Sequence, residues 1–249
     1  MRAGRSFRMG ARAAFAALAL CVGVGLPEGA SGQELSLPEV APVHEASLYN
    51  RVEAEVHAAL LAGDDDTRDR HLAAAEQLAR HLVARDTLSA DAHYWLAVAL
   101  GIKTEHSGPL QKLTTGREVF FTAGRVLELD SLHAGGHEMM GRLHAAVMRL
   151  PWLVRGLALR MGMGQVLGHA SWEQAEAHYR RAAELDAGAV APRLELAKLY
   201  VQQERIPEAM PVLAALVTLQ PRNTVDRRML VEARGILDGL PDGVPATLP

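Results

Sequence analysis

Residues 190–223 read VAPRLELAKLYVQQERIPEAMPVLAALVTLQPRN, a stretch of 34 residues rich in alanine and leucine. Leu196, Ala197 and Tyr200 stand at its positions 7, 8 and 11. This spacing places the three side chains on one face of a helix, with a small residue between two large ones. The stretch therefore predicts a first helix whose small position lets a second helix approach closely.

The second half of the same stretch predicts that second helix. Ala209, Leu213 and Leu216 stand at positions 20, 24 and 27, and Pro221 follows at position 32. Together with the first helix, this is the pattern of a tetratricopeptide unit, except that Leu216 is larger than the usual residue. The preceding second helix has the same register, with Ala175, Tyr179 and Ala182 in the equivalent positions and Ser171 with Gln174 as a capping box.

Three aspartates mark earlier joints of the same kind. Asp86, Asp130 and Asp186 each follow a predicted helix, and a large–small pair begins ten residues after each of them. The pairs are Leu96 with Ala97, Met140 with Gly141 and Leu196 with Ala197. The joints are 44 and 56 residues apart rather than 34, which predicts insertions at about 101–114 and 146–170.

The expected fold class is all-α, a tetratricopeptide-type α-solenoid of antiparallel helix pairs with two insertions and capping helices. An apolar stripe at Leu48, Val52, Val56 and Leu60 predicts an N-terminal helix, and residues 224–238 predict a closing helix. No strand pattern is evident in the sequence. The predicted parts are a signal peptide (1–32), an N-terminal linker (33–44), the helical repeat domain (45–240) and a flexible tail (241–249).

The first 32 residues have the pattern of a secretory leader. The basic residues are Arg2, Arg5, Arg8 and Arg12. An apolar run over residues 13–26 follows, too short for a comfortable bilayer span, and small residues then precede Gln33. We expect cleavage after Gly32; the alternatives are an uncleaved anchor or lipidation at Cys21. The expected location is exported, either periplasmic or associated with the outer membrane of a bacterium.

Charge and cysteine content narrow the function classes. Loss of the leader would change the formal net charge from −3 to about −6, because four arginines and one glutamate leave with it. No strong basic field then remains to attract nucleic acid. Cys21 is the single cysteine of the chain and would leave as well, so a disulfide or a cysteine nucleophile is not expected in the mature protein.

Five segments of the chain form a more specific pattern: His93-Tyr94-Trp95-Leu96-Ala97, Glu128-Leu129-Asp130, Met140-Gly141-Arg142, Pro151-Trp152-Leu153 and residues 175–186. Together they resemble the regulator of microtubule dynamics family of tetratricopeptide proteins, in its bacterial branch. The resemblance covers roughly residues 68–240, including the positions of both insertions. Eukaryotic members are linked to microtubules and organelle membranes. For this chain, the resemblance implies the helical-repeat fold and no known catalytic activity.

A concave groove is the expected binding site. In such arrays, positions 2, 5, 9 and 12 of the first helices face inward. These positions hold Asp91, Tyr94, Val98, Glu138, Arg142, Leu194, Lys198 and Val201. A mixture of charged and apolar side chains suits an extended peptide or an amphipathic helix as partner. The alternative is that these residues are merely the solvated faces of their helices.

The histidines form the one pattern that resembles a metal site. His133, His137 and His144 could lie on one helix, but His137 and His144 fall where an aromatic ring normally packs. We therefore expect a packing role, with no metal and no cofactor. The acidic run Asp64-Asp65-Asp66 lacks the pattern of a calcium loop, and no phosphate-binding or nucleophile motif is evident, so an enzyme is not expected.

The second insertion supports a different hypothesis. Arginines interrupt an otherwise apolar segment that contains Trp152, Leu153 and Leu157. Such a segment could contact a membrane interface or a lipid, which would make the chain a membrane- or lipid-associated protein. The alternative is an extra helix that packs in the gap opened between repeats.

Overall fold

Helices make up the regular structure of the computed structural model, which describes residues 45–160 and 164–240; these residues contain no strand. The predicted signal peptide, linker and tail lie outside the described residues. The helices are α1 (Glu45–Leu61), α2 (Asp65–Arg85), α3 (Ala90–Glu105), α4 (Pro109–Leu129), α5 (Ala134–Arg149), α6 (Trp152–Arg160), α7 (Gly164–Leu167), α8 (Trp172–Leu185), α9 (Ala191–Gln202), α10 (Ile206–Leu216) and α11 (Thr224–Gly239).

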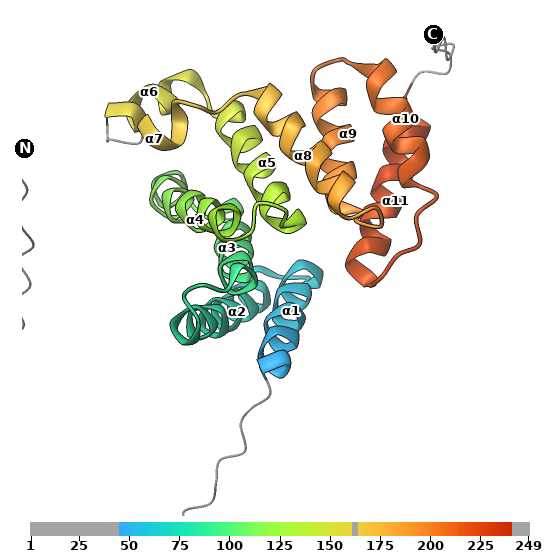
Figure 1. Cartoon of the computed structure of the whole chain (residues 1–249). Helices are drawn as coiled ribbons and strands as arrows, with labels where there is room; N and C mark the ends of the chain where they lie inside the picture. The colour runs from blue at the N-terminus through green and yellow to red at the C-terminus, as the bar shows by residue number, and fades with distance from the viewer. Residues whose placement is uncertain (1–44, 161–163, 241–249) are drawn as a thin grey trace, which may run out of the picture. The chain divides into compact units, whose positions relative to one another are not determined.

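The helices pack as consecutive antiparallel pairs (Figure 1). α1 packs on α2, α3 on α4, α5 on α8, and α9 on α10, while α11 packs on α9 and α10 and ends the array. These contacts lie within one unit of the chain, residues 42–249. The prediction of a tetratricopeptide-type α-solenoid with capping helices is confirmed.

The two insertions are accommodated differently. Around residues 101–114, the extra chain lengthens α3 and α4, which are 16 and 21 residues long. The second insertion forms α6 and α7, which separate α5 from its partner α8 along the chain. Both insertions therefore fall between the two helices of a pair, where they leave the packing between successive pairs intact.

The three aspartate joints share one local structure. Asp86, Asp130 and Asp186 are the C-caps of α2, α4 and α8, each with extended backbone. Each carboxylate accepts a hydrogen bond from the backbone N–H two residues later, at 2.9, 2.9 and 3.0 Å. In this turn, the aspartate side chain bonds to the backbone of its own loop. The first helix of the next unit then follows in the same register. The recurrence in the sequence therefore reflects a repeated turn.

The large-beside-small contact is also observed. Ala97 and Ala197 are fully buried, and Leu96 and Leu196 are nearly so. In the α5–α8 pair, a Cβ placed on Gly141 would lie 2.7 Å from two ring carbons of Tyr179, which is itself fully buried. Only glycine leaves room for this ring, so the smallest residue of the pattern stands opposite one of the largest buried side chains.

Candidate functional site

The inner helices of the array enclose a pocket of about 560 Å³. Its lining comes from α1, α3, α5, α9 and α11, with a smaller contribution from Gly116 and Val119 in the middle of α4. Four of these are the first helices of successive pairs and α11 is the closing helix; the packing of the first helices on their second helices leaves their opposite faces turned toward the pocket. The helical period therefore determines which side chains reach it.

Six of the eight predicted groove residues line this pocket. They are Tyr94, Val98, Glu138, Arg142, Leu194 and Lys198. Asp91 does not line it: one carboxylate oxygen lies 3.0 Å from Nε2 of His133. Val201 also lies outside, because it packs against the core between α8, α9 and α10. That these residues bind a partner stays a prediction.

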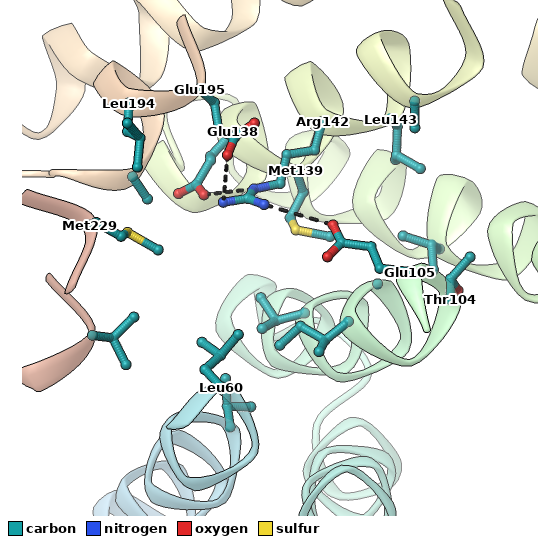
Figure 2. A pocket seen from close by; sticks show the side chains of 18 of the residues that line it. Leu60, Thr104, Glu105, Glu138, Met139, Arg142, Leu143, Leu194, Glu195 and Met229 are labelled. Carbon is teal, nitrogen blue, oxygen red and sulfur yellow. Dashed lines mark hydrogen bonds and ion pairs between the residues drawn. The ribbon is translucent and has the colours of Figure 1, made fainter. Parts of the chain in front are cut away.

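Arg142 lies at the centre of the pocket, surrounded by carboxylates (Figure 2). Its Nε donates to Glu138 Oε1 at 3.0 Å, and its two terminal nitrogens lie 3.8 Å from carboxylate oxygens of Glu195 and Glu105. Burial alone would lower the pKa of Arg142, but the carboxylates, Glu138 first, outweigh it and raise that pKa above its ordinary value. The guanidinium is therefore a permanent cation with carboxylates of three glutamates around it.

A second ion-pair group lies beside the first. Lys198 Nζ is 2.6 Å from Glu232 Oε1 on α11 and 3.5 Å from Glu195 on its own helix. Nearby, burial and then the Glu138 carboxylate raise the pKa of the Tyr94 hydroxyl above its ordinary value. The charge states of Arg142 and Tyr94 are thus fixed near neutral pH, which suits recognition of a partner better than proton transfer.

The apolar walls include side chains that the repeat pattern does not identify as groove residues. Leu60 of α1, Trp95 of α3 and Met229 of α11 line the pocket with Val98 and Leu194. Arg228 Nη1 donates to the Leu60 carbonyl at 2.9 Å, so the first and last helices meet across 168 residues of sequence. The pattern predicts both end helices, but it carries no signal for this contact.

Of the three predicted histidines, His137 and His144 pack between α5 and α8, and His133 lies at the start of α5. His133 accepts the N–H of Gly136 and caps α5 at 3.0 Å. Nδ1 of His137 lies 3.0 Å from Nδ1 of His178, a partner that the sequence pattern did not identify, and the buried ring of His144 stacks on His178 with centroids 5.5 Å apart. Burial, then His137 and His144, lower the pKa of His178 to about 4. In the described residues, no three potential ligands converge on a metal position.

The predicted membrane segment has two unlike faces. Trp152 is 76% exposed and Leu153 64% exposed at the start of α6. Val154 and Ala158 point the other way and pack in a small core with α4 and α5. The side chain of Leu157 lies outside the described residues. No helix in the described ranges is both long and apolar enough to cross a bilayer.

Comparison with known proteins identifies the family of the chain. The sequence profile of the family described as Regulator of microtubule dynamics protein 1-3 matches residues 38–241. No curated protein matches the chain. A matching solved structure, of the APC/C hetero-tetramer Cut9-Hcn1, is 14% identical with a TM-score of 0.22, and the match covers 80% of this chain and 50% of that one. Because the profile spans the repeat array and both insertions, the chain belongs to the regulator of microtubule dynamics family.

Proposed function

We propose that the chain is a non-catalytic scaffold that binds a protein or peptide segment in the groove formed by α1, α3, α5, α9 and α11. The observation that carries the proposal is the pocket itself, which combines apolar walls with a central ion-paired arginine. Helical repeats typically act as scaffolds, and a concave surface lined by first helices suits an extended or helical guest.

Site-specific photo-crosslinking tests this function. A photoreactive residue replaces Val98 in the groove, and in a matched control it replaces Val231, which is 70% exposed on α11 and does not line the pocket. With an envelope extract, the Val98 position should capture a defined polypeptide that the Val231 position does not. Equal capture at both positions would argue against the groove as the binding site.

We also propose that the chain is exported, to the periplasm or to the outer membrane, because of its basic leader followed by a short apolar run. The test is fractionation of cells that express the full chain, with the amino terminus of the recovered protein determined. A mature protein that begins at Gln33 in the periplasmic fraction is the expected result. Recovery of the intact leader in the cytoplasmic fraction would contradict the proposal.

The exposed start of α6 favours a second candidate function, contact with a membrane surface. Trp152 and Leu153 present an apolar edge, and Arg155 and Arg160 lie on the same short helix. Flotation with anionic liposomes should be lost in Trp152→Asp, whereas Val231→Asp removes an equally exposed apolar residue on α11 and should float like the wild type. If Trp152→Asp floats as well as the wild type, α6 makes no membrane contact.

A further inference from the structure

The charges that line the groove are unequal in number. The carboxylates are those of Glu105, Glu138, Glu195, Asp226 and Glu232, and the permanent cations are Arg142 and Lys198. With His57 neutral, the lining has a formal charge of −3. A cleft with apolar walls and one sign of charge concentrates the opposite charge at its mouth.

Both cations are already engaged. Arg142 has carboxylates on three helices, at 3.0 Å (Glu138), 3.8 Å (Glu105) and 3.8 Å (Glu195). Lys198 contacts Glu232 and Glu195. An anionic guest would have to displace these carboxylates before it could reach either cation, and the displaced carboxylates would remain in an apolar pocket. A guest that needs a free cation is therefore a poor fit.

The anionic groups are the more accessible ones. The side chain of Glu105 is 61% exposed and that of Glu232 is 48% exposed, whereas Glu138 and Glu195 are 18% and 14% exposed beneath them. Glu105 lies on α3 and Glu232 on α11, so partly exposed carboxylates come from two separate helices, each of them also paired with a groove cation. In the same pocket, Leu60, Val98 and Met229 offer apolar contact.

From this arrangement, and resting on the proposed function, we infer that the partner is a cationic amphipathic polypeptide segment. Its apolar side chains contact Leu60, Val98 and Met229, and its lysines or arginines meet the carboxylates of Glu105 and Glu232. Charge complementarity of this kind selects the partner and speeds its association, and it weakens as salt is added.

Two peptides of equal length, with the same leucines but with either lysine or glutamate at every other position, test this inference by isothermal titration calorimetry. The lysine peptide should bind the mature protein at least about tenfold more tightly than the glutamate peptide at low salt. Added salt should reduce the difference. Equal affinities, tighter binding of the glutamate peptide, or no binding of either peptide would overturn the inference.

A matched pair of double variants locates the effect. The double variant Glu105→Gln, Glu232→Gln removes two groove charges and should weaken binding of the lysine peptide about tenfold. Glu128→Gln with Glu184→Gln removes two exposed charges outside the groove and should leave the affinity within about twofold. Equal losses in both double variants would show a nonspecific charge effect and overturn the inference.

A steric variant separates the two proposals. Val98→Trp fills the groove without a charge change and should abolish binding of the lysine peptide; circular dichroism checks that the variant keeps its helices. If the two peptides bind equally and Val98→Trp abolishes both, the charge preference is wrong and the groove function stands. If Val98→Trp leaves binding of the lysine peptide unchanged, the groove does not hold this peptide and both proposals fail.

Discussion

The groove and α6 both combine apolar side chains with arginine, but these side chains differ in their ion pairs and exposure between the two regions. In the groove, Arg142 is held among three carboxylates, and the apolar walls come from five helices of the array. On α6, Arg155 contacts Met148 Sδ and forms no ion pair with another described residue, and Trp152 is 76% exposed. The groove is formed by the packed helices of the repeat array, whereas α6 packs on the array through a small separate core. Two segments of similar amino-acid composition thus differ in structure, and matched substitutions in the two regions should have different effects.

The sharpest separation comes from two glycines in helices. In the array, Gly141→Ala drives a Cβ into the Tyr179 ring and should lower the free energy of unfolding by about 2 kcal/mol. In the insertion, Gly156 has no atom within 4 Å of such a Cβ, so Gly156→Ala should raise it by about 0.5 kcal/mol. Urea unfolding measures both. A stabilising Gly141→Ala would contradict the close contact of α5 with α8.

Two arginines extend the comparison to charge. Arg142→Met leaves Glu138 and Glu195 without their shared cation and should cost about 1–2 kcal/mol, less than for a fully buried pair because the arginine is 28% exposed. Arg155→Met removes a side chain whose buried Nε has no hydrogen-bond partner within residues 45–160 and 164–240, and it should change stability by less than about 0.5 kcal/mol. Thermal unfolding compares the two variants. Equal losses would mean that the groove ion pairs do not stabilise the array.

The histidines give the array a pH dependence that α6 lacks. His178 has a pKa of about 4 when folded and 6.5 as its ordinary value, so below pH 6.5 the unfolded chain binds a proton that the folded chain does not. The free energy of unfolding should therefore fall as pH decreases from about 6.5 to about 4. His178→Gln should flatten this part of the profile, while His81→Gln, which removes an exposed histidine of α2, should not. An unchanged slope in His178→Gln would contradict the assignment.

The smallest effect is expected on α6. Trp152→Ala should alter the free energy of unfolding by less than about 0.5 kcal/mol, because the indole is mostly in solvent. Contact with a membrane surface would then explain why so large an apolar side chain is exposed. A loss of 2 kcal/mol or more, measured by urea unfolding, would instead show that the indole packs in the folded chain, and the second candidate function would lose its support.

The array follows from the sequence because its packing is periodic. The large–small pairs and the aspartate joints predict the helix pairs, and positions counted from Leu196 find Arg142 and Lys198 in the groove. Other features depend on contacts that no period encodes. The Arg228–Leu60 hydrogen bond joins opposite ends of the chain, and His178 meets His137 only because α5 and α8 pair across an insertion. Asp91 has a predicted groove position, yet it lies outside the pocket and contacts His133, which is 42 residues away in the sequence.

The most direct test of the groove is a methyl NMR titration with methionine ε-methyl labelling and the lysine–leucine peptide. Met139 and Met229 line the pocket from α5 and α11, while Met210 lies on α10, outside it. The resonances of Met139 and Met229 should shift with one shared binding constant, and the resonance of Met210 should not move. A shift of Met210 with Met139 and Met229 unmoved would contradict binding in the groove.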